Sequence, residues 1–185
     1  MLICGPSGVG KGTIISELRR RHPSLGLSVS WTTRPKRSGE IDGDHYRFVG
    51  EATFREALGR DEFIEHEEYR GHLYGTPWAE VRRAIDEGRD LLFEIDVRGA
   101  HNIKRLFDQA VAIFLYPPSE AVLAERLRGR GTDSPEQIQA RLEAAHAELA
   151  EKDTFDHAVL NDDVGRAVEA IEAILGFPSS QGAPS

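Results

Sequence analysis

One glycine-rich segment limits the folds that this 185-residue chain can adopt. It runs from Gly5 to Lys11, reads GPSGVGK, and lies between a short apolar run and a helical pattern. The spacing of its glycines and its lysine matches the phosphate-binding loop, or P-loop. Glycines let backbone N–H groups converge on phosphate oxygens without a Cβ in the way, and the next helix adds the positive end of its dipole. The segment therefore predicts an α/β fold with a nucleotide phosphate site.

The residue that follows Lys11 departs from the P-loop pattern. It is Gly12, where Ser or Thr would ligate Mg²⁺ directly, and Thr13 comes next. Either Thr13 contributes near the α-phosphate, or nucleotide oxygens and water hold the Mg²⁺, which keeps several waters readily. We expect Lys11 to reach the β- and γ-phosphates. The residues expected to bind the nucleoside triphosphate are Gly5, Pro6, Ser7, Gly8, Val9, Gly10, Lys11, Gly12 and Thr13.

Short apolar runs alternate with helical patterns over the rest of the chain. Runs at 2–4, 90–96, 110–116 and 157–161 predict strands. The second and third are compact enough to be buried on both faces, as in a parallel sheet. The first is shorter than most strands, so we expect modest stability unless further residues precede it. The alternation predicts right-handed crossovers in an α/β domain.

Helices are predicted early in the chain, after Ser134 and at the end. The first covers 11–22, and the last covers 163–175 and stops at Gly176. Ser134 and Gln137 form a capping-box pattern that starts another helix. The side chains expected to face the core are Ile14, Ile15 and Leu18 in the first helix, and Val164, Ala167, Val168, Ile171 and Ile174 in the last.

Residues 34–80 interrupt this pattern. They carry short, polar-rich strand patterns at 45–49, 63–67 and 72–74, and a short helix is expected to start at Thr53. We interpret the stretch as a small β-rich insertion on the parallel core.

A second insertion covers 119–141, where a helix–turn–helix is expected with Gly129 and Gly131 at its bend. We predict one domain over 1–176 and a disordered tail over 177–185. The core segments are expected at 1–33, 81–118 and 142–176.

Composition and charge exclude several classes of protein. The net charge of −8 argues against a general nucleic-acid coat or a membrane-surface binder. The longest apolar run, 110–116, is too short to cross a bilayer, and no secretory signal pattern opens the chain. The single cysteine, Cys4, excludes an intramolecular disulfide and a thiolate metal cluster. We therefore expect a cytoplasmic monomer or homodimer whose partners are small molecules, not nucleic acid or membrane.

A set of further motifs resembles the guanylate kinase family. The motifs occur in the family's order, cover about residues 2–175, and are highly specific as a set. The segments that carry the resemblance are 5–11 (GPSGVGK), 28–40 (SVSWTTRPKRSGE), 42–48 (DGDHYRF), 63–65 (FIE), 74–77 (YGTP), 94–99 (EIDVRG), 128–131 (RGRG) and 161–163 (NDD).

The resemblance implies both a fold and an activity. The fold is a P-loop three-layer α/β/α arrangement with a parallel core sheet, a small mixed-β GMP-binding insertion and a helical lid. The activity is Mg²⁺-dependent transfer of the γ-phosphate of ATP to GMP or dGMP, which gives GDP and ADP in purine nucleotide metabolism.

Arg34 and Arg37 lie on one turn beside a strand end. Two guanidinium groups placed there can grip a terminal phosphate bidentately. For such a pair alone, a solvated basic turn is the better interpretation, and only the surrounding motifs reverse it. The resemblance implies that both arginines and Tyr46 bind the phosphate of GMP, with Tyr74 nearby.

The resemblance assigns the guanine edge to acidic and hydroxyl residues. Guanine presents N1–H and its 2-amino group, and a carboxylate, which only accepts hydrogen bonds, matches both donors. Adenine would leave that carboxylate unpaired, a mismatch that can discriminate on the order of 10⁴-fold in favourable cases. By resemblance, Glu65 reads the base with help from Asp96, and Ser30 and Thr76 lie near guanine O6.

Four arginines, Arg126, Arg128, Arg130 and Arg141, gather on the second insertion. Arginines carried by a closing lid would stabilise the charge that develops on the γ-phosphate and would exclude water. The resemblance favours Arg130 and Arg141 as catalytic residues beside Lys11, with Arg130 also near the base of ATP. It leaves Arg126 and Arg128 as a solvated helix face.

Two further polar residues complete the expected site. The resemblance implies that Asn161 contacts adenine. Glu94 ends a hydrophobic strand, as acids of metal-binding strands do, so it either binds Mg²⁺ through water or hydrogen bonds to the P-loop. No general base is needed, because the attacking GMP phosphate oxygen is already ionised.

Two alternatives stay open on the sequence alone. Another kinase on the same scaffold, such as one that phosphorylates ribose 1,5-bisphosphate, has no guanine to read, so Glu65 and Thr76 argue against it. A guanylate-kinase-like module that binds phosphorylated protein segments without catalysis would not need Lys11, Arg130 and Arg141.

Overall fold

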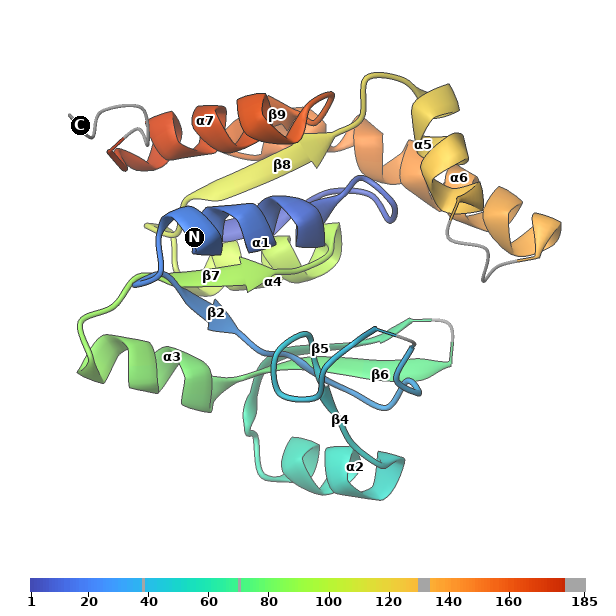
Figure 1. The fold of residues 1–185 in the computed structure, drawn as a ribbon. Coiled ribbons are helices and arrows are strands. Elements are labelled where there is room, and N and C mark those ends of the chain that lie inside the picture. Colours follow the sequence, from blue (N-terminus) through green and yellow to red (C-terminus); the bar gives the residue numbers. More distant parts are fainter. Residues whose placement is uncertain (38, 70, 130–133, 179–185) are drawn as a thin grey trace.

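A five-stranded parallel sheet forms the centre of the computed structural model, which describes residues 1–37, 39–69, 71–129 and 134–178 (Figure 1). The strands follow the order β2–β7–β1–β8–β9, and each neighbouring pair is parallel. Their bounds are β1 Leu2–Cys4, β2 Gly26–Ser28, β7 Leu91–Glu94, β8 Ala112–Tyr116 and β9 His157–Leu160. The four core strands predicted from the apolar runs are therefore confirmed, with the first only three residues long.

Helices cover both faces of this sheet. Helices α1 (Lys11–Arg21) and α7 (Val164–Leu175) pack on the face that Ile3 of β1 meets. Helix α4 (Val97–Leu106) packs on the opposite face, together with Leu2 and Cys4. Because successive side chains of a strand point to opposite faces, the short β1 is anchored in both cores at once. The predicted α/β architecture with a parallel core sheet is confirmed.

A second, mixed sheet lies beside the core and supplies much of the candidate site (Figure 1). Its order is β4–β3–β6–β5, with β3 parallel to β4 and antiparallel to β6, which is antiparallel to β5. The elements are β3 Trp31–Thr32, β4 Arg47–Phe48, β5 Phe63–Tyr69, β6 His72–Pro77 and α2 Glu51–Gly59. Phe54 of α2 stacks on Phe63 of β5 at 4.5 Å between ring centroids, which gives this sheet a small core of its own.

The remaining elements are helical. Helices α5 (Glu120–Arg128) and α6 (Pro135–Ala150) pack through Leu123, Leu127 and Ala145. Gly131 lies outside the described residues, as does most of the predicted tail. The other helices are α3 Trp78–Asp86 and the 3₁₀ turn η1 Lys152–Thr154. Among the helices that the structure describes, none combines the length and apolar character that crossing a bilayer requires.

Two local predictions are wrong. Helix α2 begins at Glu51 after Gly50, so the exposed Thr53 lies within the helix and does not start it. Glu51 places its carboxylate in the first turn, where the helix dipole favours negative charge. Val164 is 36% exposed because it is the first residue of α7, which Asp163 caps by accepting from Arg166 N. The predicted inward residues Ala167, Val168 and Ile171 are buried.

The capping box at the start of α6 is confirmed and gives a test of local stability. Gln137 N donates to Ser134 Oγ at 3.3 Å, and Ser134 N donates to Gln137 Oε1 at 2.9 Å.

We expect Ser134→Ala to lower the free energy of unfolding by about 1 kcal/mol, because the first turn of α6 loses its cap. Urea unfolding measures this loss. Ser24→Ala, in an exposed turn, serves as control and should stay within about 0.5 kcal/mol of the parent; equal effects of the two variants would contradict the role of the cap.

Candidate active site

The P-loop leaves the carboxyl end of β1 and opens α1. A Cβ at Gly5 would lie 2.3 Å from the carbonyl oxygen of Leu115, and its φ is +134°, so only glycine fits here. Gly10 adopts φ +103° as the residue before α1, and no side chain caps that helix. No side chain therefore occupies the N–H groups of the first turn, which is the arrangement in which a helix start can bind an anion.

Lys11 folds back over the loop that precedes it. Its Nζ donates to the carbonyl oxygen of Gly5 at 2.6 Å and to that of Pro6 at 3.4 Å. Gly12 and Thr13 are exposed in the first turn of α1, beside Ser7 and Gly8 of the loop. The structure thus gathers the predicted ATP-binding residues 5–13 into one loop and helix start.

Asn161 and Arg126 fix the P-loop through hydrogen bonds to Val9. The amide of Asn161, which follows β9 and is 3% exposed, donates to Val9 O at 2.7 Å. Arg126 of α5 donates to Val9 O and to Asn161 O, each at 2.9 Å. The prediction that Arg126 lies on a solvated helix face is therefore wrong, whereas Arg128 is exposed. Helical spacing could not reveal a contact between segments more than one hundred residues apart.

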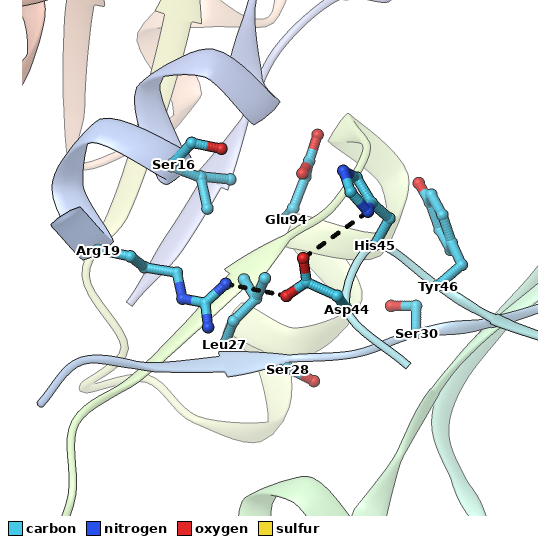
Figure 2. A pocket seen from close by; sticks show the side chains of 10 residues that line it. Ser16, Arg19, Leu27, Ser28, Ser30, Asp44, His45, Tyr46 and Glu94 are labelled. Carbon is cyan, nitrogen blue, oxygen red and sulfur yellow. Dashed lines mark hydrogen bonds and ion pairs between the residues drawn. The ribbon is translucent and has the colours of Figure 1, made fainter. Parts of the chain in front are cut away.

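Glu94 links the P-loop to the second sheet. Both of its carboxylate oxygens lie 3.9 Å from the position that a Cβ on Gly12 would take. Glu94, Tyr46, Ser30 and Ser16 also line one cavity of about 50 Å³ (Figure 2). Burial, followed by the charge of Glu94, raises the pKa of Tyr46 above its ordinary value. Glu94 and Tyr46 therefore lie between the P-loop and the second sheet. We call the P-loop side the donor half of the candidate site and the second-sheet side its acceptor half.

The predicted phosphate-gripping residues meet around the buried Arg34. Its guanidinium carbon lies 5.6 Å from the ring centroid of Tyr46, and the ring of Tyr74 lies 6.0 Å from that of Tyr46. Both oxygens of Glu40 accept from Arg34, at 2.7 and 3.0 Å. Arg37 lies three residues away on the same turn with an exposed side chain. The structure thus brings Arg34, Tyr46 and Tyr74 together and presents Arg37 to solvent beside them.

The predicted base-reading residues form a hydroxyl–carboxylate array. Glu65 and Thr76 are direct partners in the register of β5 and β6, and Thr76 Oγ1 donates to Glu65 Oε1 at 2.6 Å. Ser30 Oγ lies 3.3 Å from Thr76 Oγ1. Asp96 caps α4 by accepting from Gly99 N at 2.7 Å. The array offers carboxylate acceptors next to hydroxyl donors, which suits a base edge that carries both donors and an acceptor.

Several acidic side chains lie close together at this array. Burial raises the pKa of Glu65 to about 7, and the charges of Asp96 and Glu67 add to that effect, while the Thr76 hydroxyl opposes it. Burial also raises the pKa of Glu148 on α6 to about 7; Lys11 opposes this shift and Asp96 strengthens it. Glu148 was missed from the sequence, because only the fold brings α6 into the field of Lys11 and Asp96.

The remaining predicted residues lie on the helical pair or outside the described chain. Arg141 of α6 is 5% exposed. Arg130 lies outside the described residues. Within the described parts of the chain, no group of three or more His, Cys, Asp or Glu side chains is arranged to hold a metal ion.

Comparison with known proteins adds independent information. A family model described as "Guanylate kinase" matches residues 1–176. The guanylate kinase of Gloeobacter violaceus is 51% identical over 175 residues, which is 95% of this chain and 85% of the relative. That of Carboxydothermus hydrogenoformans is 46% identical over 175 residues, again 95% of this chain and 86% of the relative.

Solved structures show the same likeness. The guanylate kinase of Anaplasma phagocytophilum superposes with a TM-score of 0.79 at 29% identity, over 95% of this chain and 84% of that one. A shikimate kinase from Bacteroides thetaiotaomicron gives a TM-score of 0.52 at 16% identity, over 95% and 97% of the two chains, and shares the fold.

The raised pKa of Glu65 predicts how stability depends on pH. Between its ordinary value of 4.5 and about 7, the folded chain holds a proton at Glu65 that the unfolded chain releases. Stability therefore falls as pH rises through this window, and Glu65→Gln should remove up to about 3 kcal/mol of that fall. Urea unfolding at pH 5 and pH 8 measures it, with the variant gaining stability over the parent only at pH 8. Glu68→Gln, at an exposed position of β5, is the control; the same pH response in both variants would contradict the prediction.

Proposed function

The chain belongs to the guanylate kinase family, and we propose from this premise how its residues divide the work of the reaction. The protein is a nucleoside monophosphate kinase that phosphorylates GMP to GDP with ATP as donor. The observation that supports the residue assignment is a chain of contacts. Thr76 joins Glu65 to Ser30, Ser30 lines one cavity with Tyr46 and Glu94, and Glu94 lies beside Gly12 at the start of α1.

In the proposed mechanism, the P-loop and Lys11 hold the triphosphate of ATP. An ionised oxygen of the GMP phosphate attacks the γ-phosphorus, a new P–O bond forms, and the bond between the γ-phosphorus and the bridging oxygen breaks. The electron pair of that bond stays on the β-phosphate of the departing ADP. Since the nucleophile is already an anion, the protein contributes alignment and charge neutralisation, and no side chain needs to remove a proton.

The acceptor half is proposed to grip GMP at both of its ends. Arg34, Arg37, Tyr46 and Tyr74 bind the phosphate, with Arg34 supplying charge next to two phenol hydroxyls. A guanidinium and phenol cluster of this kind neutralises a dianion in a partly dry place without adding a titrating group near pH 7.

Guanine is proposed to lie against the Glu65 carboxylate, which accepts from N1–H and the 2-amino group, with Asp96 close by. Thr76 donates to Glu65, and the Ser30 hydroxyl lies 3.3 Å from Thr76 Oγ1. Ser30 and Thr76 are proposed to turn a hydroxyl proton from these bonds to O6 when guanine binds. The proposed contacts go to the base and the phosphate, and dGMP is therefore proposed as a substrate as well.

Residues beside the P-loop are proposed to bind the base of ATP and to stabilise its γ-phosphate. Asn161 borders adenine while its amide fixes Val9. Arg141 approaches the γ-phosphate from α6, and the sequence motif extends this role to Arg130. Arginine charge placed there stabilises the transition state and excludes water from it.

Mg²⁺ is proposed as the metal cofactor, and the donor set fits it. Glu94 presents a carboxylate to the start of α1 at Gly12, where the P-loop pattern would supply a hydroxyl. A hard cation that keeps its waters suits one carboxylate acting through water. When bound with ATP, Mg²⁺ neutralises part of the charge on the β- and γ-phosphates.

The wider setting is also a proposal. We propose that the protein works in the cytoplasm on small nucleotides, as a monomer or a homodimer. We propose a core at 1–33, 81–118 and 142–176, a GMP-binding insertion at 34–80, and a lid at 119–141. The separate small core around Phe54 and Phe63 supports treating the insertion as a unit of its own.

Lys11→Met tests the donor half. We expect kcat to fall by at least about 10²- to 10³-fold, because the charge that develops on the phosphates loses its cation. A coupled assay of ADP release gives the rate, and circular dichroism checks that the fold survives. Lys152→Met, in η1, is the matched control and should keep the parent rate; parent-like turnover of Lys11→Met would remove the P-loop lysine from the mechanism.

Glu65→Gln tests the acceptor half. We expect the KM for GMP to rise about 10- to 100-fold, because a guanine N–H then meets an amide N–H in a partly dry pocket. The KM for ATP should change less than about twofold. The ADP-release assay is run with GMP, dGMP, AMP and no acceptor, with Glu68→Gln as control. Equal losses for GMP and ATP would show that Glu65 does not read the base.

A further inference from the structure

Glu40 makes a close contact with Arg34, and the proposed mechanism gives Glu40 no role. It lies in the loop between β3 and β4 and folds back on Arg34, six residues earlier. Arg34 Nη2 donates to Glu40 Oε1 at 2.7 Å and Arg34 Nη1 donates to Oε2 at 3.0 Å. Oε2 also accepts from the backbone N–H of Arg37 at 2.7 Å. The arginine and glutamate side chains are 9% and 16% exposed, so this is a partly desolvated, bidentate pair.

The contact fixes the plane of the Arg34 guanidinium. A planar fork bonded through two nitrogens cannot rotate about its long axis without breaking both bonds. Arg34 Nη1 also donates to Pro35 O at 2.7 Å, and the rings of Tyr46 and Phe48 lie 5.6 and 5.5 Å from the guanidinium carbon. The Nη1–Nη2 edge is thus committed to the protein. Arg34 also interacts with the hydroxyl of Tyr74, another residue predicted to bind the phosphate. The other edge, formed by Nε and the second hydrogen of Nη2, takes no part in the pair with Glu40, and it is the edge that we assign to a ligand.

We propose that Glu40 is a positioning residue for the acceptor phosphate: it holds Arg34 by one edge so that the other edge meets the phosphate of GMP. The inference rests on the proposed role of Arg34 in binding that phosphate. A guanidinium ordered before the substrate arrives loses less rotational freedom on binding, which strengthens the interaction. The bond that Glu40 accepts from Arg37 N sets the shape of the same turn, so one carboxylate places both predicted phosphate ligands.

The charge of Glu40 makes the proposal easy to test, because its two effects on a phosphate have opposite signs. As an anion, it repels a phosphate and cancels part of the charge of Arg34. As a hydrogen-bond acceptor, it orients Arg34 toward that phosphate. Its bonds from Arg34 and Arg37 outweigh burial and lower its pKa, so it is charged throughout the neutral range. Glu40→Gln removes the charge and turns one acceptor into a donor that faces a guanidinium N–H, so the direction of the change shows which effect dominates.

The experiment compares the parent, Glu40→Gln, Arg34→Lys and the double variant. We expect Glu40→Gln to raise the KM for GMP about 10- to 100-fold, since a charge-assisted bond is lost. The KM for ATP and the kcat at saturating GMP should each change less than about threefold. The inhibition constant of guanosine, which lacks the phosphate, should not change. Glu17→Gln is the matched control, because Glu17 is also a partly buried glutamate that accepts from two arginines, in the second half of α1.

Each outcome bears on one part of the proposal. A double variant no weaker for GMP than Arg34→Lys alone supports action through Arg34, and additive losses overturn it. An unchanged or lower KM for GMP in Glu40→Gln overturns the positioning role. Equal weakening of guanosine and GMP also overturns it, because that result points to a general loss of structure. If Arg34→Lys leaves the KM for GMP unchanged, the proposed phosphate role of Arg34 itself fails, and this result is distinct from a failure of Glu40 alone.

Discussion

The close approach of Gly5 to the backbone of Leu115 determines where the phosphate loop leaves the sheet. With a Cβ position only 2.3 Å from a carbonyl oxygen, the chain can pass this point only as glycine. The loop then lies against α5, where a Cβ at Gly8 would meet Leu127 and Leu123, and leads into α1 at Lys11. In parallel strands the carboxyl edge of the sheet, where the loop begins, also receives the end of β7 and the residues that follow β7 and β9, so Glu94, Asp96 and Asn161 lie there.

The site buries acidic side chains close to one another. Glu65 and Glu148 titrate near pH 7 because they are desolvated next to other acids, and Lys11 is the cation that opposes the shift of Glu148. Burying ionised acids in this way costs stability at neutral pH. In the proposed assignment, a base edge with two donors adds hydrogen bonds to the one that the Glu65 carboxylate accepts from Thr76, and these offset the cost.

The sequence predicted best where chemistry and local geometry coincide. The P-loop, the buried strands 2–4 and 110–116 and the capping box at Ser134 each have a signal within a few residues. The sequence failed where the structure depends on distant contacts. Strand β3 has only two residues, 31 and 32, and exists because β4 and β6 pair with it. Arg126 contacts the P-loop, and Glu148 lies in the field of Lys11, only because α5 and α6 pack next to the loop. Helix α2 begins at Glu51 after Gly50 and not at Thr53, as the pattern predicted.

If Glu65 reads the base as proposed, its pairing with Thr76 makes base selectivity depend on strand register. The two residues face each other only because β5 and β6 align as they do, just past an irregularity between Phe63 and Glu65. A shift of either strand by one residue would turn one member of the pair to the opposite face of the sheet. New nucleobase preferences in this scaffold are therefore accessible through exchange of side chains in place. A single-residue insertion or deletion in the hairpin would instead disturb both the proposed base contact and Tyr74 of β6, and leave the P-loop on the other sheet intact.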